Sequence, residues 1–186
     1  MCKQTGKALA WIVMGVFVFV AAYAVRQAAS EQKGPLAGSK RPVITGYYSP
    51  EKGRYGEVLK IYIAAEDADG DMQKIATQVT QPGFGTYSPS WLNLKGERRQ
   101  RFIGYLQWNT FSSKGKDLSD GSRISIDISL FDSAGNESNR IVIPYEFVSG
   151  APSPPSPPAP FDQPGISRLG YISIDLQDPT KQEGFF

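Results

Sequence analysis

The chain has 186 residues and a formal charge of +2, from 20 basic and 18 acidic side chains, with no histidine and one cysteine. This balance lacks the basic excess of a nucleic-acid-binding domain. The missing histidine excludes His-based catalytic triads, His proton shuttles and His-ligated zinc or haem. The single Cys2 excludes an intrachain disulfide. The length suits one ordinary domain with additional segments.

Residues 1–25 have the order of an export segment: Lys3 and Lys7 precede an uncharged apolar run over residues 8–25. Two interpretations remain open. Ala22-Tyr23-Ala24 offers a small-x-small cleavage pattern, so the segment can be a signal peptide. The run also just reaches the length of a membrane-spanning helix, about 17–25 residues, so it can be a retained anchor. Both predict an exported domain, in the periplasm or at the cell surface, with residues 8–25 in the inner membrane if the anchor stays.

Composition divides the remaining chain into four segments. Residues 26–41 are polar and indicate a flexible spacer, and residues 42–149 form the folded domain. Residues 150–160 are rich in proline, which fixes φ and lacks the amide donor. We therefore expect a polyproline II linker there, about 3.1 Å per residue and about 30 Å long. Residues 161–186 form a C-terminal tail.

The folded segment predicts an all-β fold, because short runs alternate with the strand period of two between turn residues. In the clearest run, Ile124, Ile126 and Ile128 share one face. Pro144 cannot donate to a ladder and predicts an edge or a bulge. We expect a seven-stranded, Ig-like antiparallel sandwich, with a barrel as the alternative. The predicted strands are Pro42–Tyr48, Glu57–Ala65, Gln73–Thr80, Trp91–Lys95, Gln100–Trp108, Ser122–Phe131 and Arg140–Val148.

Two motifs resemble those of known extracellular modules. The sequence Leu118-Ser119-Asp120-Gly121-Ser122, a strand, and then Asp132-Ser133-Ala134-Gly135-Asn136-Glu137-Ser138 resembles the C-terminal half of bacterial Ig-like domains. The acidic turn at residues 66–71 is similar to one in related sandwich modules. The resemblance to bacterial Ig-like and fibronectin type III-like domains covers residues 57–80 and 118–148. It implies an extracytoplasmic structural, adhesive or binding module without catalysis.

The acidic turn is also a candidate calcium site, because alternating carboxylates supply the oxygen ligands that calcium prefers. In a sandwich, the turns after the second and the sixth predicted strands lie at the same end. Aspartate and asparagine are equally good turn formers without an ion, so both interpretations stay open. The candidate calcium ligands are Asp67, Asp69, Asp71, Asp132 and Asn136.

Aromatic residues in a long Gly- and Pro-rich loop form a second candidate site, because functional residues concentrate in such loops. Phe84, Tyr87 and Trp91 can stack on a sugar, or they can fill the core. The tail gives a third candidate. Residues 169–176 alternate like a strand and can add to a sheet edge of their own domain or of a neighbour. Tyr171, Phe185 and Phe186 are its candidate contact residues.

These features favour a non-enzymatic envelope or surface module that binds another protein, without nucleic acid and with no cofactor other than calcium. The alternative is a carbohydrate-binding module that uses Phe84, Tyr87 and Trp91. A carboxylate-based enzyme is the third hypothesis, but no two acidic residues stand out as a catalytic pair. The partner, its contact with the tail, and the oligomeric state are not fixed by the sequence.

Overall fold

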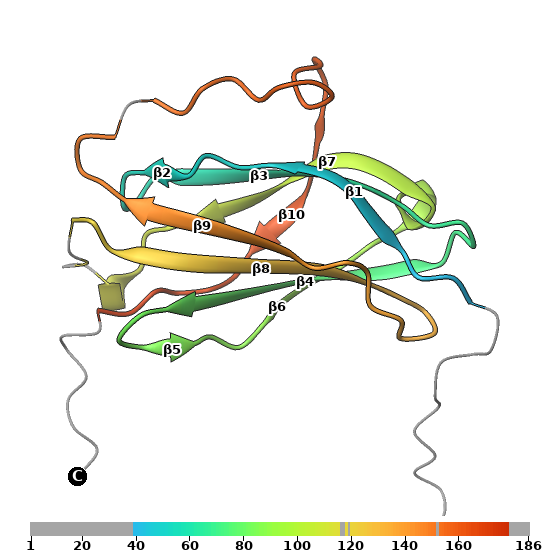
Figure 1. The fold of residues 1–186 in the computed structure, drawn as a ribbon, viewed down its shortest axis with the longest axis horizontal. Coiled ribbons are helices and arrows are strands. Elements are labelled where there is room, and N and C mark those ends of the chain that lie inside the picture. Colours follow the sequence, from blue (N-terminus) through green and yellow to red (C-terminus); the bar gives the residue numbers. More distant parts are fainter. Residues whose placement is uncertain (1–38, 116–117, 119, 152, 179–186) are drawn as a thin grey trace, which may run out of the picture. The chain divides into compact units, whose positions relative to one another are not determined.

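The computed structural model describes residues 39–115, 118, 120–151 and 153–178, and within them the chain forms two β-sheets (Figure 1). Sheet A has the order β1-β3-β7-β10, and sheet B has the order β2-β9-β8-β4-β5, with β6 also paired to β4. The strands are β1 (Val43–Tyr48), β2 (Lys52–Gly53), β3 (Val58–Glu66), β4 (Met72–Gln81), β5 (Gly85–Thr86), β6 (Ser90–Asn93), β7 (Arg101–Asn109), β8 (Arg123–Asp132), β9 (Ile141–Phe147) and β10 (Ser167–Ile172). Two short 3-10 helices are η1 (Gly96–Arg99) and η2 (Ser113–Gly115).

The all-β sandwich is therefore confirmed, with two separate sheets rather than a closed barrel, but the described residues form ten strands where seven were predicted. In the Ig-like arrangement, strands A, B and E share one sheet, and strands C, F and G share the other. Here β1, β3 and β7 take the first three positions, while β4, β8 and β9 take the others. Two edge pairs differ from the expected antiparallel pattern, because β10 runs parallel to β7 and β2 runs parallel to β9.

The core lies between the sheets and follows the predicted alternation. Each long strand buries every second side chain against the opposite sheet, which is the period that a half-buried strand requires. The largest fully buried side chain is that of Trp108 on β7. Residues with essentially no exposed surface include Ile61, Ile63, Met72, Val79, Trp108, Ile126, Ile128, Leu130 and Leu176.

The C-terminal segment belongs to this core. Leu169, Ile172, Ile174 and Leu176 are buried in the same cluster as the strands of the sandwich. The β10 strand begins beside Gly104 of β7, where an added Cβ would stand 2.5 Å from a Leu169 methyl carbon. Glycine is needed at this position because the Leu169 side chain occupies the space that a side chain at residue 104 would fill.

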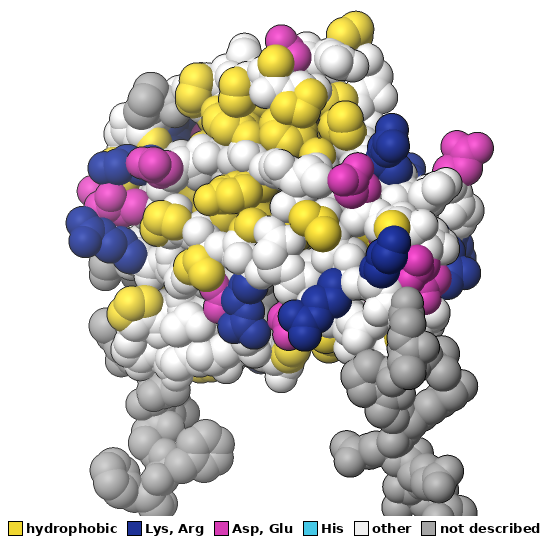
Figure 2. Space-filling view, turned by 45° about the vertical axis from the view of Figure 1, so that its right-hand side comes forward, with side chains coloured by type: hydrophobic (Ala, Val, Ile, Leu, Met, Phe, Trp, Pro, Cys, Tyr) yellow, Lys and Arg dark blue, Asp and Glu magenta, His cyan; other side chains and the backbone are white. Residues whose placement is uncertain are grey.

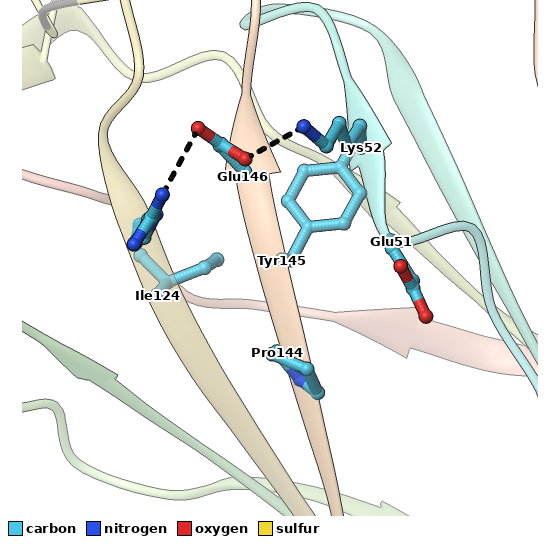
Figure 3. Close-up of a pocket in the computed structure, with 7 residues that line it drawn as sticks. Glu51, Lys52, Ile124, Pro144, Tyr145 and Glu146 are labelled. Carbon is cyan, nitrogen blue, oxygen red and sulfur yellow. Dashed lines mark ion pairs between the residues drawn. The ribbon is translucent and has the colours of Figure 1, made fainter.

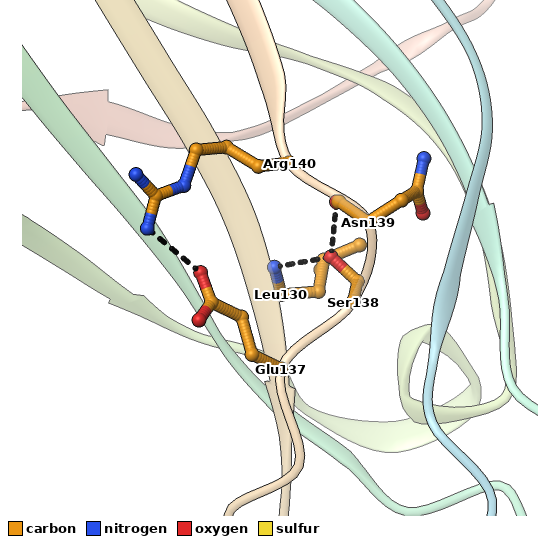
Figure 4. Close-up of polar contacts among 5 residues, drawn as sticks. All are labelled: Leu130, Glu137, Ser138, Asn139 and Arg140. Atoms are coloured by element: carbon orange, nitrogen blue, oxygen red, sulfur yellow. Dashed lines mark hydrogen bonds and ion pairs between the residues drawn. The ribbon is translucent and has the colours of Figure 1, made fainter.

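The turn between β8 and β9 shows what the Ig-like motif does (Figure 4). The Ser138 hydroxyl accepts a hydrogen bond from the Leu130 amide at 2.9 Å and donates one to the Asn139 carbonyl at 2.7 Å. The Asn139 side chain then accepts from the Ile44 amide at 2.8 Å and donates to the Ile44 carbonyl at 3.1 Å. It thereby pairs with β1 as a strand backbone would. Glu137 and Arg140 form an exposed ion pair at 3.5 Å.

Pro144 lies at a sheet edge, as predicted. The neighbouring strand β2 reaches only the end of β9, pairing Lys52 with Glu146 and Gly53 with Phe147. The Glu146 amide donates across this edge to Glu51 at 2.9 Å. Backbone nitrogens two residues apart in a strand point to the same side, so the nitrogen of Pro144 points to the same edge as that of Glu146. The strand β2 does not extend as far as Pro144. The missing donor therefore leaves no unpaired amide and blocks strand addition there.

No helix in the described ranges is long and apolar enough to cross a membrane. The predicted export or anchor segment, residues 1–25, lies outside the described residues.

The close contact at Gly104 gives a direct test of the tail packing. We expect Gly104→Ala to lower the free energy of unfolding by about 1–3 kcal/mol, because the new methyl group overlaps Leu169 and the Ser167 carbonyl. Urea unfolding measures the change. Gly150→Ala is the matched control, since nothing lies within 4 Å of its Cβ position. Equal stability of the two variants would contradict the described position of β10.

Candidate functional site

The outer face of sheet A carries a row of aromatic and cationic side chains across all four of its strands. The register pairs Tyr48 with Tyr62, Tyr62 with Tyr105, and Tyr105 with Arg168. Ring centroids are 6.1 Å apart for Tyr48 and Tyr62, and 5.6 Å apart for Tyr62 and Tyr105. Tyr171, on the same side of β10, keeps 54% of its surface exposed. We call this set, Tyr48, Tyr62, Tyr105, Arg168 and Tyr171, the tyrosine row.

Neighbouring side chains hold the exposed end of the tyrosine row in place. The Arg168 guanidinium lies 4.3 Å from the centre of the Tyr171 ring and donates a hydrogen bond to the Gln107 side chain at 3.3 Å. The Lys60 ammonium lies 5.0 Å from the centre of the Tyr105 ring. Such cation–π contacts favour a fixed arrangement of ring and cation. These contacts thus hold the exposed side chains of the row in defined positions.

The proline-rich segment covers the other end of the row. Figure 1 shows it passing over β2 and β3 before the chain descends into β10. Tyr48 donates its hydroxyl hydrogen to the Pro155 carbonyl at 3.1 Å, and Phe161 is buried with its ring 5.8 Å from that of Tyr62. A cavity of about 300 Å³ remains between this segment and the sheet, bordered by Tyr48, Tyr62 and Lys60.

The loop aromatics Phe84, Tyr87 and Trp91 do not form one platform. Phe84 and Tyr87 stack on each other, with centroids 4.5 Å apart and planes at 21°. The Tyr87 hydroxyl also donates to the Gln81 side chain and accepts from the Gln177 amide at 2.8 Å, so Tyr87 secures the tail. Trp91 pairs with Ala76, whereas the Phe84 turn follows Gln81. At about 3.3 Å per strand residue, the two sites lie about 16 Å apart along β4.

Trp91 instead belongs to a small cluster on the outer face of sheet B. Its ring centroid lies 5.5 Å from that of Phe131, and the Lys74 ammonium lies 4.4 Å above the indole. Half of the Trp91 surface, 50%, is exposed. The cluster therefore presents one flat aromatic ring beside a cation.

Figure 2 shows how hydrophobic side chains gather into a band on one face of the domain, bordered by charged groups.

The two acidic turns meet at one end of the sandwich, as the sequence predicted. The Ser133 amide donates to the Asp71 carbonyl at 3.1 Å, and the Ser133 hydroxyl donates to the Asp71 carboxylate. Asp132 accepts from the Asn136 amide and from its side chain, both at 2.7 Å. Asp67 accepts from the Asp71 amide at 2.9 Å. Most of these carboxylate oxygens thus fix the turns.

The two buried carboxyl groups differ in pKa. Burial raises the pKa of Asp67, and the neighbouring Asp71 carboxylate adds to this rise. Burial also acts on Asp132, but the hydrogen bonds from Asn136 and Ser39 outweigh it and lower the pKa of Asp132. Asp69 accepts the Lys40 amide at 2.6 Å, where the chain enters the domain.

In the described ranges, no three His, Cys, Asp or Glu side chains are arranged to hold a metal ion. Asp71 Oδ1 is a buried carboxylate oxygen without a hydrogen-bond partner. The carboxylates of Asp67, Asp69 and Asp132 accept hydrogen bonds from backbone amides. A calcium ion at this end would compete with those amides for most of its ligands. Calcium binding by Asp67, Asp69, Asp71, Asp132 and Asn136 stays a prediction.

A hollow of about 240 Å³ lies at the edge where β2, β9 and β8 meet (Figure 3). Its main charged group is Glu146, which forms ion pairs with Lys52 at 3.0 Å and Arg123 at 3.6 Å. The hydrogen bond from Lys52 lowers the pKa of Glu146, which stays ionised at neutral pH. Burial raises the pKa of Tyr145 to about 12, so its hydroxyl stays protonated. Neither group is poised for proton transfer near neutral pH.

Of the predicted tail contacts, Tyr171 lies in the tyrosine row, while Phe185 and Phe186 lie outside the described residues. The sequence reasoning did not single out Tyr62 and Arg168. A signal was present for Tyr62, which falls between the inward-facing Ile61 and Ile63 and must therefore point outward. No such signal existed for Arg168, because its neighbours depend on how the tail docks.

No family model and no curated protein matches this chain. Among solved structures, it is similar to the PKD domain of an M14-like peptidase from Thermoplasmatales archaeon SCGC AB-540-F20, with 14% identity and a TM-score of 0.36 over 60% of this chain and 100% of that one. It is also similar to a CARDB domain from Pyrococcus furiosus, whose structure is described as a complex with di-metal ions. That match has 8% identity and a TM-score of 0.34 over 63% of this chain and 97% of the other.

Opposite pKa shifts predict opposite pH responses at the two carboxyl groups. Asp132→Asn should cost about 1–3 kcal/mol at neutral pH, because an amide nitrogen, which cannot accept a hydrogen bond, replaces one of two buried acceptor oxygens. The stability that the Asp132 carboxylate contributes is present above the ordinary carboxyl pKa. It is lost as pH falls through the lowered folded pKa, so the wild-type advantage shrinks in acid.

Asp67→Asn is the matched control. Because its folded pKa is raised, wild type should gain stability relative to this variant as pH falls through that pKa. Urea unfolding between about pH 3 and 7 measures both differences. Parallel pH profiles for the two variants would show that the described hydrogen bonds do not set these pKa values.

Proposed function

We propose that this chain is an exported, non-enzymatic binding module, and that a protein partner contacts the outer face of sheet A. The observation that carries the proposal is the tyrosine row, which ends in the exposed pair Arg168 and Tyr171. Export rests on the segment at residues 1–25, which is typical of a signal peptide or an inner-membrane anchor. The domain would then act in the periplasm or at the cell surface.

The composition of the tyrosine row favours a protein partner. Tyrosine and arginine are enriched where protein interfaces concentrate their binding energy, while lysine and glutamate are depleted. The tyrosine rings offer large contact areas with few rotatable bonds, so little conformational entropy is lost on binding. Arg168 already rests against Tyr171 and Gln107, which lowers the ordering cost further.

The chemistry of the chain gives little support to catalysis. Histidine is absent from the whole sequence. In the edge hollow, Glu146 is ion-paired, and the pKa of Tyr145 lies at about 12. The buried carboxyl groups Asp67 and Asp132 accept hydrogen bonds that shape their turns. These groups have structural roles, which supports a binding module rather than an enzyme.

Carbohydrate binding remains the second candidate, and Trp91 is the observation that favours it. Its half-exposed indole on the outer face of sheet B is a surface on which a sugar ring can stack. The site differs from the one predicted, because Phe84 and Tyr87 are elsewhere and Lys74 and Phe131 are its neighbours. The two candidates therefore use opposite faces of the sandwich.

Site-specific photocrosslinking in the producing cells separates the two faces. A photoreactive amino acid at position 171 should yield a discrete protein adduct, and the same residue at position 91 should not. Adding Arg168→Ala should weaken the adduct at position 171, because loss of an interface anchor lowers affinity by about tenfold or more.

A glycan array with purified protein and its Trp91→Ala variant is the companion measurement. No sugar binding, together with adducts at position 171, supports the protein-binding proposal. Sugar binding that Trp91→Ala abolishes, with no adduct at position 171, would contradict it and favour the carbohydrate alternative.

A further inference from the structure

The last part of the described chain lies in a groove built to hold an extended strand. From β10 onward the side chains alternate: Ile172, Ile174 and Leu176 are buried, while Ser173 and Asp175 are exposed. The groove lies between β7 on one side and β4 and β6 on the other. We call residues 167–178 the tail strand.

Side chains of the groove bind the backbone of the tail strand. The Trp108 indole donates to the Ile174 carbonyl at 2.9 Å, and the Ser173 amide donates to the Ser90 hydroxyl at 3.0 Å. Further along, the Gln81 side chain donates to the Gln177 carbonyl at 2.8 Å. Backbone hydrogen bonds with pockets for alternate side chains are the means by which proteins recognise an added strand.

Glycines allow the close contact between the groove and the tail strand. Gly104 leaves room for Leu169, and Gly170 of the tail strand leaves room for Leu92, whose methyl carbon would stand 2.4 Å from an added Cβ. The groove and the tail strand thus have complementary shapes, although they are parts of one chain.

The segment that connects the domain to the tail strand is short and exposed. Phe161 is buried against the sheet, and residues 162–165 after it are exposed. Within this connection Gly165 adopts φ +90°, a conformation that L side chains rarely adopt, and it turns the chain back into β10. A short exposed turn, which needs glycine at position 165, thus brings the tail strand back to its own domain.

We propose that the groove also accepts the tail strand of a second copy of this chain, so that two molecules exchange tail strands and dimerise. The exchanged dimer keeps every contact of the tail strand, and only the turn at residues 162–166 opens. Exchange of identical elements is a low-cost route to dimers, and hinge turns control it. The exchange carries Arg168 and Tyr171 of the tyrosine row into the second copy, but it needs no partner other than this chain.

Two single-cysteine chains detect the exchange directly, each in the Cys2→Ser background. One carries Ser90→Cys and the other carries Ser173→Cys, at positions joined by a hydrogen bond in the structure. After co-incubation at high concentration and mild oxidation, a covalent heterodimer should form, because the tail strand of one chain sits in the groove of the other. Its yield should rise with protein concentration and fall when an excess of the Cys2→Ser chain without added cysteines is present.

The double variant Ser90→Cys/Ser173→Cys in one chain is the positive control. It should form its disulfide within the chain at low concentration, which shows that the geometry permits the bond. An efficient intrachain disulfide with no heterodimer at any concentration would overturn the proposal. Homodimers of either single-cysteine chain at the same yield would also overturn it, since random collision would then explain the bond.

A hinge variant with a matched control adds a second readout. Gly165→Ala strains the closed turn and should raise the heterodimer fraction by about fivefold. Gly135→Ala is matched, because Gly135 has φ +88° and, like Gly165, nothing within 4 Å of its Cβ position. It lies in the β8–β9 turn, so it should leave the dimer fraction unchanged. An equal effect of both variants would contradict a hinge at residues 162–166.

Discussion

The sandwich depends on covering both inner faces along their full length, and the strands of residues 43–147 do not achieve this alone. Sheet A would end at β7, with Trp108 and Leu106 at an open edge. The tail strand fills the gap with four buried apolar side chains: Leu169, Ile172, Ile174 and Leu176. It also satisfies the Trp108 indole nitrogen, a donor that would be costly to bury without an acceptor.

The position of the tail strand explains the departure from the common topology. In Ig-like sheets, strand D directly precedes strand E in sequence and pairs with it, and β7 takes the position of strand E here. Here the chain enters β7 from η1 after leaving sheet B at β6. The place beside β7 therefore stays free for a strand from the end of the chain. Because that strand arrives after a long crossing over sheet A, it runs parallel to β7.

The same docking event creates the candidate binding surface. Arg168 and Tyr171 reach the outer face of sheet A together because the register shifts between Arg168 and Gly170, while Leu169 and Ile172 face inward. A surface that joins Tyr48 to Tyr171 thus depends on the core contacts of the tail. Exchange of the tail strand between two copies would rebuild this surface on each domain from two chains.

Strand periodicity predicted much of the fold, and it failed where position depends on tertiary contacts. The alternation of Ile124, Ile126 and Ile128 identified β8, and the meeting of the acidic turns followed from sandwich topology. The alternation in residues 169–176 equally fits an edge of its own domain or of a neighbour. Only Gly104 and the Trp108 indole select its own groove, and these contacts have no signature in sequence.

The candidate sites show the same limit. Phe84, Tyr87 and Trp91 are close in sequence but separate along β4, because Trp91 pairs at Ala76 and the Phe84 turn lies beyond Gln81. The tyrosine row combines residues from four strands, and it exists only through their register. Residue types could suggest aromatic recognition, but the sheet decides which rings are neighbours.

Equilibrium unfolding of a chain truncated before Ser167 tests the central claim most directly. Removing four buried apolar side chains should cost on the order of 6–12 kcal/mol, which is comparable to the whole stability of an ordinary domain. The truncated domain should therefore lose its cooperative unfolding transition and its near-ultraviolet circular dichroism at 25 °C. A truncated domain that unfolds cooperatively at the urea midpoint of the full chain would show that the sandwich is complete without its tail.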